Sequence, residues 1–128
     1  MSVLTLDTTD ATATQVWIPA CASASLAPER GVAILLPDGS QAALFRTFDG
    51  NLYAIDNIDP FSNAAVMARG IVGDRGGEPT VASPMLKQVF SLRSGVCFDD
   101  TTVRQTTYPV RERDGVIEIA TGSKGGTS

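Results

Sequence analysis

This chain is organised around two proline-containing stretches, NIDPFS at Asn57–Ser62 and SPMLKQVF at Ser83–Phe90. Each stretch lies next to sequence that is rich in β-branched and apolar residues. Proline has no backbone N–H, so it is favoured in loops and at strand ends over the interior of a sheet. The second stretch runs into Ser91–Gly95, which is typical of a strand end followed by a turn. We therefore expect two loops set into a β-rich domain.

Turn signals on either side of these loops predict an antiparallel architecture. Asp-Gly dipeptides stand between apolar runs at 38–39, 49–50 and 114–115. Such a dipeptide is a strong hairpin signal, and it predicts positive φ at both of its residues. The predicted strands cover residues 15–19, 31–36, 41–48, 51–55, 108–113 and 116–119, and Pro19 is expected to end the first of them. This pattern favours an antiparallel meander or sandwich.

The middle of the chain departs from that pattern. Residues 62–70 predict a two-turn helix that Ser62 caps and Gly70 closes. Short strands at 71–72 and 80–82 are expected on either side of a glycine-rich turn. We therefore expect a small loop-and-strand insert over about residues 57–97.

Length and composition bound the class of protein. The 128 residues predict a single domain over 15–120, with a mobile tail at 1–14 and a disordered tail at 121–128. No apolar run approaches the roughly 20 residues that cross a bilayer, so no membrane partner is expected. The first 14 residues lack the basic and apolar segments of a secretory signal, which predicts a cytoplasmic protein.

Charge and residue types exclude several functions. The formal net charge of −4 argues against a general nucleic-acid binder. The chain contains no histidine, which removes imidazole bases, His-activated nucleophiles and His metal ligands. Its two cysteines, Cys21 and Cys97, could form one disulfide, but nothing in the sequence pairs them, and in a reducing compartment they are expected to be buried or free thiols. Residues 69–113 carry seven basic and five acidic side chains, which reflects either ordinary surface unevenness or a basic face that orients an acidic partner.

Other candidate sites are weak. Asp56, Asn57 and Asp59 lack the glycine and glutamate spacing of a calcium loop. Gly73–Gly77 lacks the spacing of a phosphate-binding loop, and Asp99–Asp100 is expected in a solvated turn. We expect no catalytic residue, cofactor site or metal site in this chain.

The two loops resemble the cluster-binding loops of the Rieske iron–sulfur family. That family binds a [2Fe–2S] cluster through two cysteines and two histidines. The motif DPF at 59–61 stands where the family has Cys-Pro-His, and SPML at 83–86 stands where it has Cys-Pro-Trp-His. The resemblance implies an all-β, Rieske-like antiparallel β-sandwich with a smaller insert at a former cluster site. The vestigial ligand positions are Asp59, Phe61, Ser83 and Leu86.

A cavity that has lost its metal must be filled or collapse. We expect Asp59 and Ser83 to bond loop amides, as short polar side chains do in turns. At least one of Phe61 and Leu86 is expected to point inward between the loops. If both are exposed, the loops are instead a hydrophobic docking tip.

Longer stretches resemble a narrower family, the small subunits of assimilatory NAD(P)H-dependent nitrite reductases. The resemblance covers roughly residues 15–120 and is carried by AIDNIDPFS at 54–62, RGIVGD at 69–74, VASPMLKQVFSL at 81–92 and GVC at 95–97. It implies a small, cofactor-free accessory subunit with no active site of its own. The enzyme would reduce nitrite to ammonium in nitrate assimilation. The implied partner is a large subunit that carries FAD, an iron–sulfur cluster and sirohaem.

The surface expected to contact the large subunit is the former cluster tip. Its candidate residues are Pro60, Phe61, Met85, Leu86 and Lys87, with Arg69 on the rim. Two other classes stay open. One is a free-standing Rieske-like interaction module with no redox role, and the other is a cluster-binding ferredoxin, which the missing histidines contradict.

Overall fold

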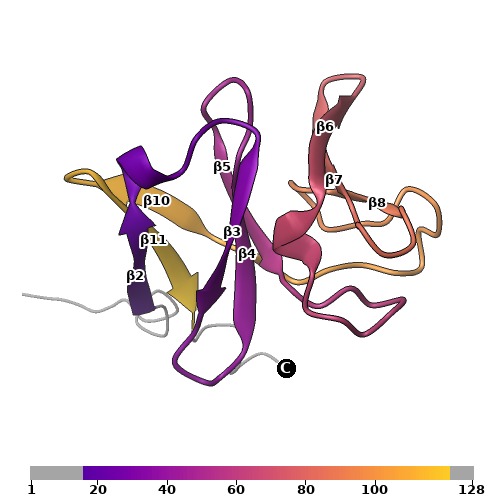
Figure 1. The fold of residues 1–128 in the computed structure, drawn as a ribbon, viewed down its shortest axis with the longest axis horizontal. Coiled ribbons are helices and arrows are strands. Elements are labelled where there is room, and N and C mark those ends of the chain that lie inside the picture. The colour runs from indigo at the N-terminus through magenta and orange to yellow at the C-terminus, as the bar shows by residue number, and fades with distance from the viewer. Residues whose placement is uncertain (1–15, 122–128) are drawn as a thin grey trace, which may run out of the picture.

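The computed structural model describes residues 16–121 as three antiparallel sheets (Figure 1). Their strand orders are β10-β11-β2, β3-β4-β5-β9 and β6-β7-β8. The strands are β2 (Val16–Ala22), β3 (Arg30–Leu35), β4 (Gln41–Arg46), β5 (Leu52–Asp56), β6 (Ile71–Arg75), β7 (Glu78–Ala82), β8 (Val89–Ser91), β9 (Thr107–Tyr108), β10 (Val110–Arg113) and β11 (Val116–Thr121). Two 3₁₀ turns, η2 (Ser23–Ser25) and η3 (Met67–Arg69), complete the regular structure of this part of the chain. The prediction of an all-β, Rieske-like fold is confirmed.

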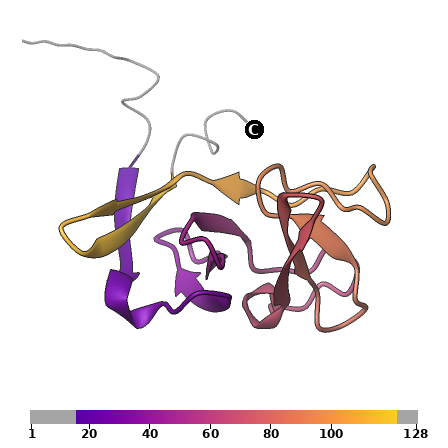
Figure 2. The ribbon, with the colours of Figure 1, turned by 90° about the horizontal axis from the view of Figure 1, so that it is seen from above.

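The first two sheets form the sandwich, and the third forms the insert beside it. Figure 2 shows the two halves side by side, with the indigo and yellow strands in one half and the rose to salmon strands of the insert in the other. Apolar side chains of β3, β4 and β5 meet those of β11 in the sandwich core, where Leu44, Ile117 and Ile119 are fully buried.

Strand β4 lies between two hydrophobic cores and is buried on both faces. Because successive side chains of a strand point to opposite faces, its residues divide alternately between them. Ala42 and Leu44 belong to the sandwich core, whereas Ala43 and Phe45 belong to the core beneath the insert. All four are fully buried. The insert is therefore packed onto the central sheet and shares its hydrophobic wall.

At the edge of the insert core, the backbone of Gly70 lies close to the backbone of β7. Gly70 follows η3, and a Cβ placed on it would lie 2.5 Å from the carbonyl oxygen of Ala82 and 2.6 Å from Val81 Cγ2. Its φ is −69°, so the requirement for glycine is steric and not conformational. The absence of a side chain lets η3 and β7 pack together over Met67, which is fully buried.

Three local predictions need correction. Pro19 lies inside β2, because β2 is an outer strand and its register with β11 shifts beside Pro19, between Ile117 and Glu118. The helix predicted over 62–70 is a bridge between Ile58 and Ala65 followed by the single turn η3. The strands flanking the glycine-rich turn are longer than predicted, because only Gly76 and Gly77 form that turn.

Of the three Asp-Gly turns, one has positive φ at both residues. Asp114 has a φ of 51° and Gly115 of 80°, as a two-residue hairpin requires. At the other two turns the glycine alone is positive, with φ values of 91° at Gly39 and 92° at Gly50. These loops are longer, so the aspartate keeps an ordinary conformation. The predicted tails lie outside the described residues, except that Thr121 belongs to β11.

Candidate functional site

The loops of the insert are joined by a hydrogen bond between two buried polar side chains. Asp59 stands in the first loop and Ser83 ends β7 at the start of the second; they are 0% and 1% exposed. The Ser83 hydroxyl donates to Asp59 Oδ2. We call this pair the Asp59–Ser83 clasp. It connects positions 24 residues apart in the chain and fixes the spacing of the two loops.

Each member of the clasp also shapes its own loop. The Phe61 N–H donates to Asp59 Oδ1 at 2.8 Å, and the Met85 N–H donates to Ser83 Oγ at 3.2 Å. The Lys87 N–H closes the second loop onto the Ser83 carbonyl at 3.1 Å. The prediction that Asp59 and Ser83 bond loop amides is confirmed. The hydrogen bond between their side chains was not predicted.

The apolar side chains of the loops are exposed, not buried between them. The exposed fractions are 36% for Phe61, 50% for Met85 and 54% for Leu86. One face of Phe61 still rests on the core, with its ring centroid 6.2 Å from that of Phe90. The expectation that Phe61 or Leu86 points inward between the loops is wrong, because both side chains are exposed and the buried side chains that link the loops are Asp59 and Ser83. The second expectation, an exposed hydrophobic tip, describes this surface.

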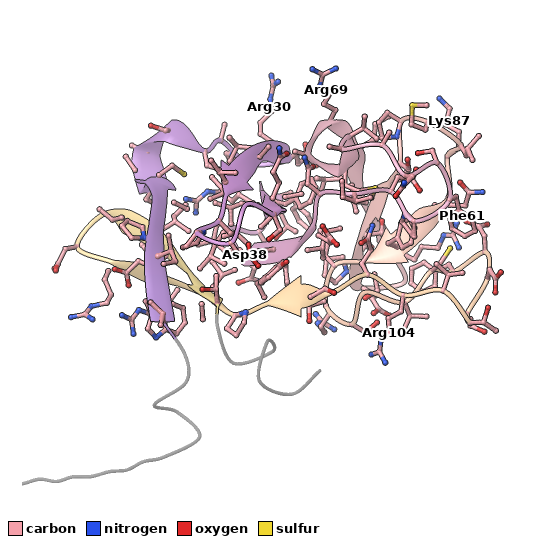
Figure 3. The ribbon with its side chains drawn as sticks, turned by 90° about the horizontal axis from the view of Figure 1, so that it is seen from below. Arg30, Asp38, Phe61, Arg69, Lys87 and Arg104 are labelled. Carbon is pink, nitrogen blue, oxygen red and sulfur yellow. The ribbon has the colours of Figure 1, made fainter. Side chains whose placement is uncertain are left out.

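We define the tip as Pro60, Phe61, Met85, Leu86 and Lys87, which lie on the two loops and are all exposed. Figure 3 shows Phe61 at the end of the molecule, with Lys87 near it. Arg69 is not on the rim of this tip. It lies beside Arg30, where the two line one groove, and it is separated from Phe61 along the molecule (Figure 3). Arg69 therefore belongs to a different surface.

A second polar network holds the first loop against the sandwich. The Asn57 side chain donates to Gln41 Oε1 at 2.9 Å and accepts from the Ala68 N–H at 2.8 Å. Gln105 donates to the carbonyl of Ile58 at 2.9 Å. Both amide side chains are buried. The sequence contains no motif that identifies either residue, because each is recognised only by partners that are distant in the chain.

The remaining weak candidates have structural roles. Asp99 accepts a hydrogen bond from the Val89 N–H at 2.9 Å, and Asp100 accepts one from the Thr102 hydroxyl at 2.6 Å. This bond lowers the pKa of the Asp100 carboxyl below its ordinary value. The prediction that Asp99 and Asp100 lie in a solvated turn is confirmed, since both are exposed. Within residues 16–121 no cluster of three or more potential metal-ligating side chains occurs.

The residues at the loop positions do not fit a Rieske cluster. Such a cluster needs two thiolates and two imidazoles. The four positions offer a carboxylate, a phenyl ring, a hydroxyl and an isobutyl group, and the clasp directly joins two of them. The cysteines cannot substitute, because Cys21 packs against the sandwich core and Cys97 is buried in the insert core. Both are free thiols, and burial raises the pKa of Cys21.

Comparisons with known proteins agree with this fold. Residues 16–120 match the family model for a Rieske-like [2Fe-2S] domain. The nitrite reductase (NADH) small subunit of Escherichia coli K12 is 39% identical over 104 residues, which cover 80% of this chain and 95% of that protein. A solved structure from Mycobacterium tuberculosis, named as an NADH-dependent nitrite reductase small subunit, is 56% identical with a TM-score of 0.81. It is matched over 84% of this chain and 96% of its own length.

A third relative carries a similar segment inside a longer protein. The nitrite reductase [NAD(P)H] large subunit of Klebsiella oxytoca is 37% identical over 103 residues, which are 80% of this chain and 11% of that protein. The fold and the family match over residues 16–120 define a Rieske-like domain. Within that class, the chain belongs to the family of nitrite reductase small subunits.

Proposed function

We propose that this chain is a cofactor-free accessory subunit of a cytoplasmic NAD(P)H-dependent nitrite reductase, and that its tip docks on the catalytic large subunit. The observation that carries the proposal is the tip itself. Three large apolar side chains are exposed together on loops whose shape is held by the buried clasp. Exposed apolar patches on a rigid support are typical of protein interaction sites.

The Klebsiella relative supports the choice of partner. There a segment similar to this chain is part of the same polypeptide as a nitrite reductase large subunit. Two units that share one chain in one protein act together, so their separate counterparts are expected to associate. FAD, an iron–sulfur cluster and sirohaem would then reside in the large subunit, where nitrite is reduced to ammonium for nitrate assimilation.

The accessory role follows from the chemistry of the loops. We infer that Asp59, Phe61, Ser83 and Leu86 occupy vestigial ligand positions, where a carboxylate–hydroxyl pair replaced the cluster as the link between the loops. None of the four side chains exchanges electrons with a redox partner. The chain would therefore act by contact, stabilising or shaping the large subunit, and not by relaying electrons.

The test is NADH-dependent nitrite consumption by the purified large subunit, with increasing amounts of this chain. We expect activity or lifetime to rise saturably near equimolar addition. The double variant Met85→Ser/Leu86→Ser should weaken this effect by about tenfold, since it removes two exposed apolar contacts. Leu35→Ser is the matched control, because Leu35 is 70% exposed on β3, in the sandwich half of the molecule.

Two results would overturn the proposal. If the tip variant is as effective as the unmodified chain, the tip is not the docking surface. If the unmodified chain neither changes activity nor co-elutes with the large subunit, the chain is instead a free-standing Rieske-like interaction module. In that case the same tip would serve a different partner.

A further inference from the structure

A groove away from the tip runs between the start of β3 and the start of β6. Its lining residues come from two short segments, Glu29–Gly31 and Ala68–Val72. The absence of a side chain at Gly31 brings the two segments together, because a Cβ there would lie 2.6 Å from the Ala68 carbonyl oxygen. The backbones of the two segments therefore lie close together at this point of the groove.

The lining of this groove carries two positive charges and one negative charge, and neither arginine forms an ion pair within the described residues. Arg30 and Arg69 are both exposed, and they project together from one edge of the molecule (Figure 3). Across residues 16–121 the one ion pair is that between Arg111 and Glu118. Glu29 is the single acidic residue of the lining. Two arginines on a protein of net charge −4 form a local positive surface that favours an acidic ligand.

The groove also offers an unpaired sheet edge. Strand β6 is hydrogen-bonded to β7 on one side and is the outer strand of its sheet. An outer strand presents N–H and C=O groups to which an extended segment can add. Ile71, at the start of β6, is 74% exposed and is the most exposed large apolar side chain in the described part of the chain. An acidic segment lying here would gain backbone, apolar and charge contacts together.

We propose that this groove binds an acidic, extended segment of the large subunit, which adds beside β6 with its carboxylates facing Arg30 and Arg69. This inference rests on the proposed function, because it assumes the same partner. Figure 3 shows Arg30, Arg69 and Lys87 of the tip along the same side of the molecule. The large subunit would then contact two surfaces, an apolar tip and a basic groove.

The experiment compares affinities of full-length variants for the purified large subunit at about 50 mM and about 500 mM NaCl. The test variant is Arg30→Glu/Arg69→Glu. Its control is Arg104→Glu, because Arg104 is exposed and points from the opposite side of the molecule (Figure 3). We expect the double variant to bind about tenfold more weakly at low salt and to approach the unmodified chain at high salt, because added ions screen exposed charges. Arg104→Glu should change binding by less than about twofold.

Hydrogen exchange of the backbone amides of β6 supplies the second measurement. Addition of the segment beside β6 should slow exchange within Ile71–Arg75 when the unmodified chain is in the complex. The inference is overturned if the double variant binds as tightly as Arg104→Glu, or if the β6 amides exchange equally fast in free and bound chains. Either result leaves the proposed function intact when the Met85→Ser/Leu86→Ser variant still loses affinity. If the unmodified chain does not bind the large subunit at all, both proposals fail.

Discussion

At the scale of single residues, the Asp59–Ser83 clasp accounts for the shape of the two loops. A buried carboxylate is costly unless its oxygens are hydrogen-bonded. Here one oxygen accepts from the Phe61 amide and the other from the Ser83 hydroxyl. The turn chemistry of each residue was predictable from its neighbours in the chain. The hydrogen bond between the two side chains was not predictable, because it depends on the position of β7, which places the second loop next to the first.

We predict that Ser83→Ala destabilises the fold by about 1–3 kcal/mol, because it leaves Asp59 Oδ2 buried without a donor. The measurement is the urea midpoint of unfolding at constant slope. Ser62→Ala is the control, since Ser62 is only half-buried and its hydroxyl accepts one long bond of 3.4 Å from the Ala64 amide. Equal midpoints for the two variants would show that the clasp contributes no stability.

At the scale of elements, the hairpin turns were predicted better than the helical segments. The Asp-Gly turns depend on residues that are adjacent in the chain, and all three join antiparallel strands. The predicted helix depends on packing as well. Asn63 takes a φ of 63°, which interrupts helical geometry, and residues 58 and 65 pair instead. A short helix has little intrinsic stability, so the tertiary contacts of η3 decided the outcome.

The turn between β4 and β5 contains Asp49, whose carboxyl has a lowered pKa that can be measured. The Thr47 hydroxyl donates to Asp49, and this bond is the main reason that the pKa of the Asp49 carboxyl lies below its ordinary value. A carboxyl with a lowered pKa favours the folded state at higher pH, and this contribution is lost as the pH falls through the folded-state pKa.

We predict that Thr47→Val raises the pKa of Asp49 toward its ordinary value and removes that acid-dependent contribution. The measurement is an NMR titration of the side-chain carboxyl carbons. Asp100 is an internal control in the same sample, because its lowered pKa depends on Thr102. An unchanged titration of Asp49 in Thr47→Val would show that the hydroxyl does not hold the carboxylate.

At the scale of the whole molecule, the insert and the sandwich share one wall. Ala42 and Leu44 of β4 pack in one core and Ala43 and Phe45 in the other, and β5 divides in the same way at Ala54 and Ile55. The buried amides of Asn57 and Gln105 add polar links across the same boundary. A tip on this insert is therefore supported by both halves of the protein.

We predict a single unfolding transition for both halves. Ile55→Val, in the insert core, should cost about 0.5–1.5 kcal/mol and shift the transition reported by Trp17, the one tryptophan of the chain, which lies on β2 in the sandwich. Ile117→Val is the control, because Ile117 lies in the sandwich core. If the Trp17 fluorescence midpoint moves in Ile117→Val but not in Ile55→Val, the two halves unfold independently.

The sequence by itself determined the all-β class, the hairpin turns, the two loops and the chemical mismatch with an iron–sulfur cluster. These features depend on residue types and on neighbours a few positions apart, such as Asp-Gly pairs and the total lack of histidine. Tertiary structure alone decided the clasp, the exposure of Phe61 and Leu86, and the pairing of Arg30 with Arg69 in one groove. Each of these depends on segments more than 20 residues apart in the chain, and they come together only through the fold of the insert and its packing against the sandwich.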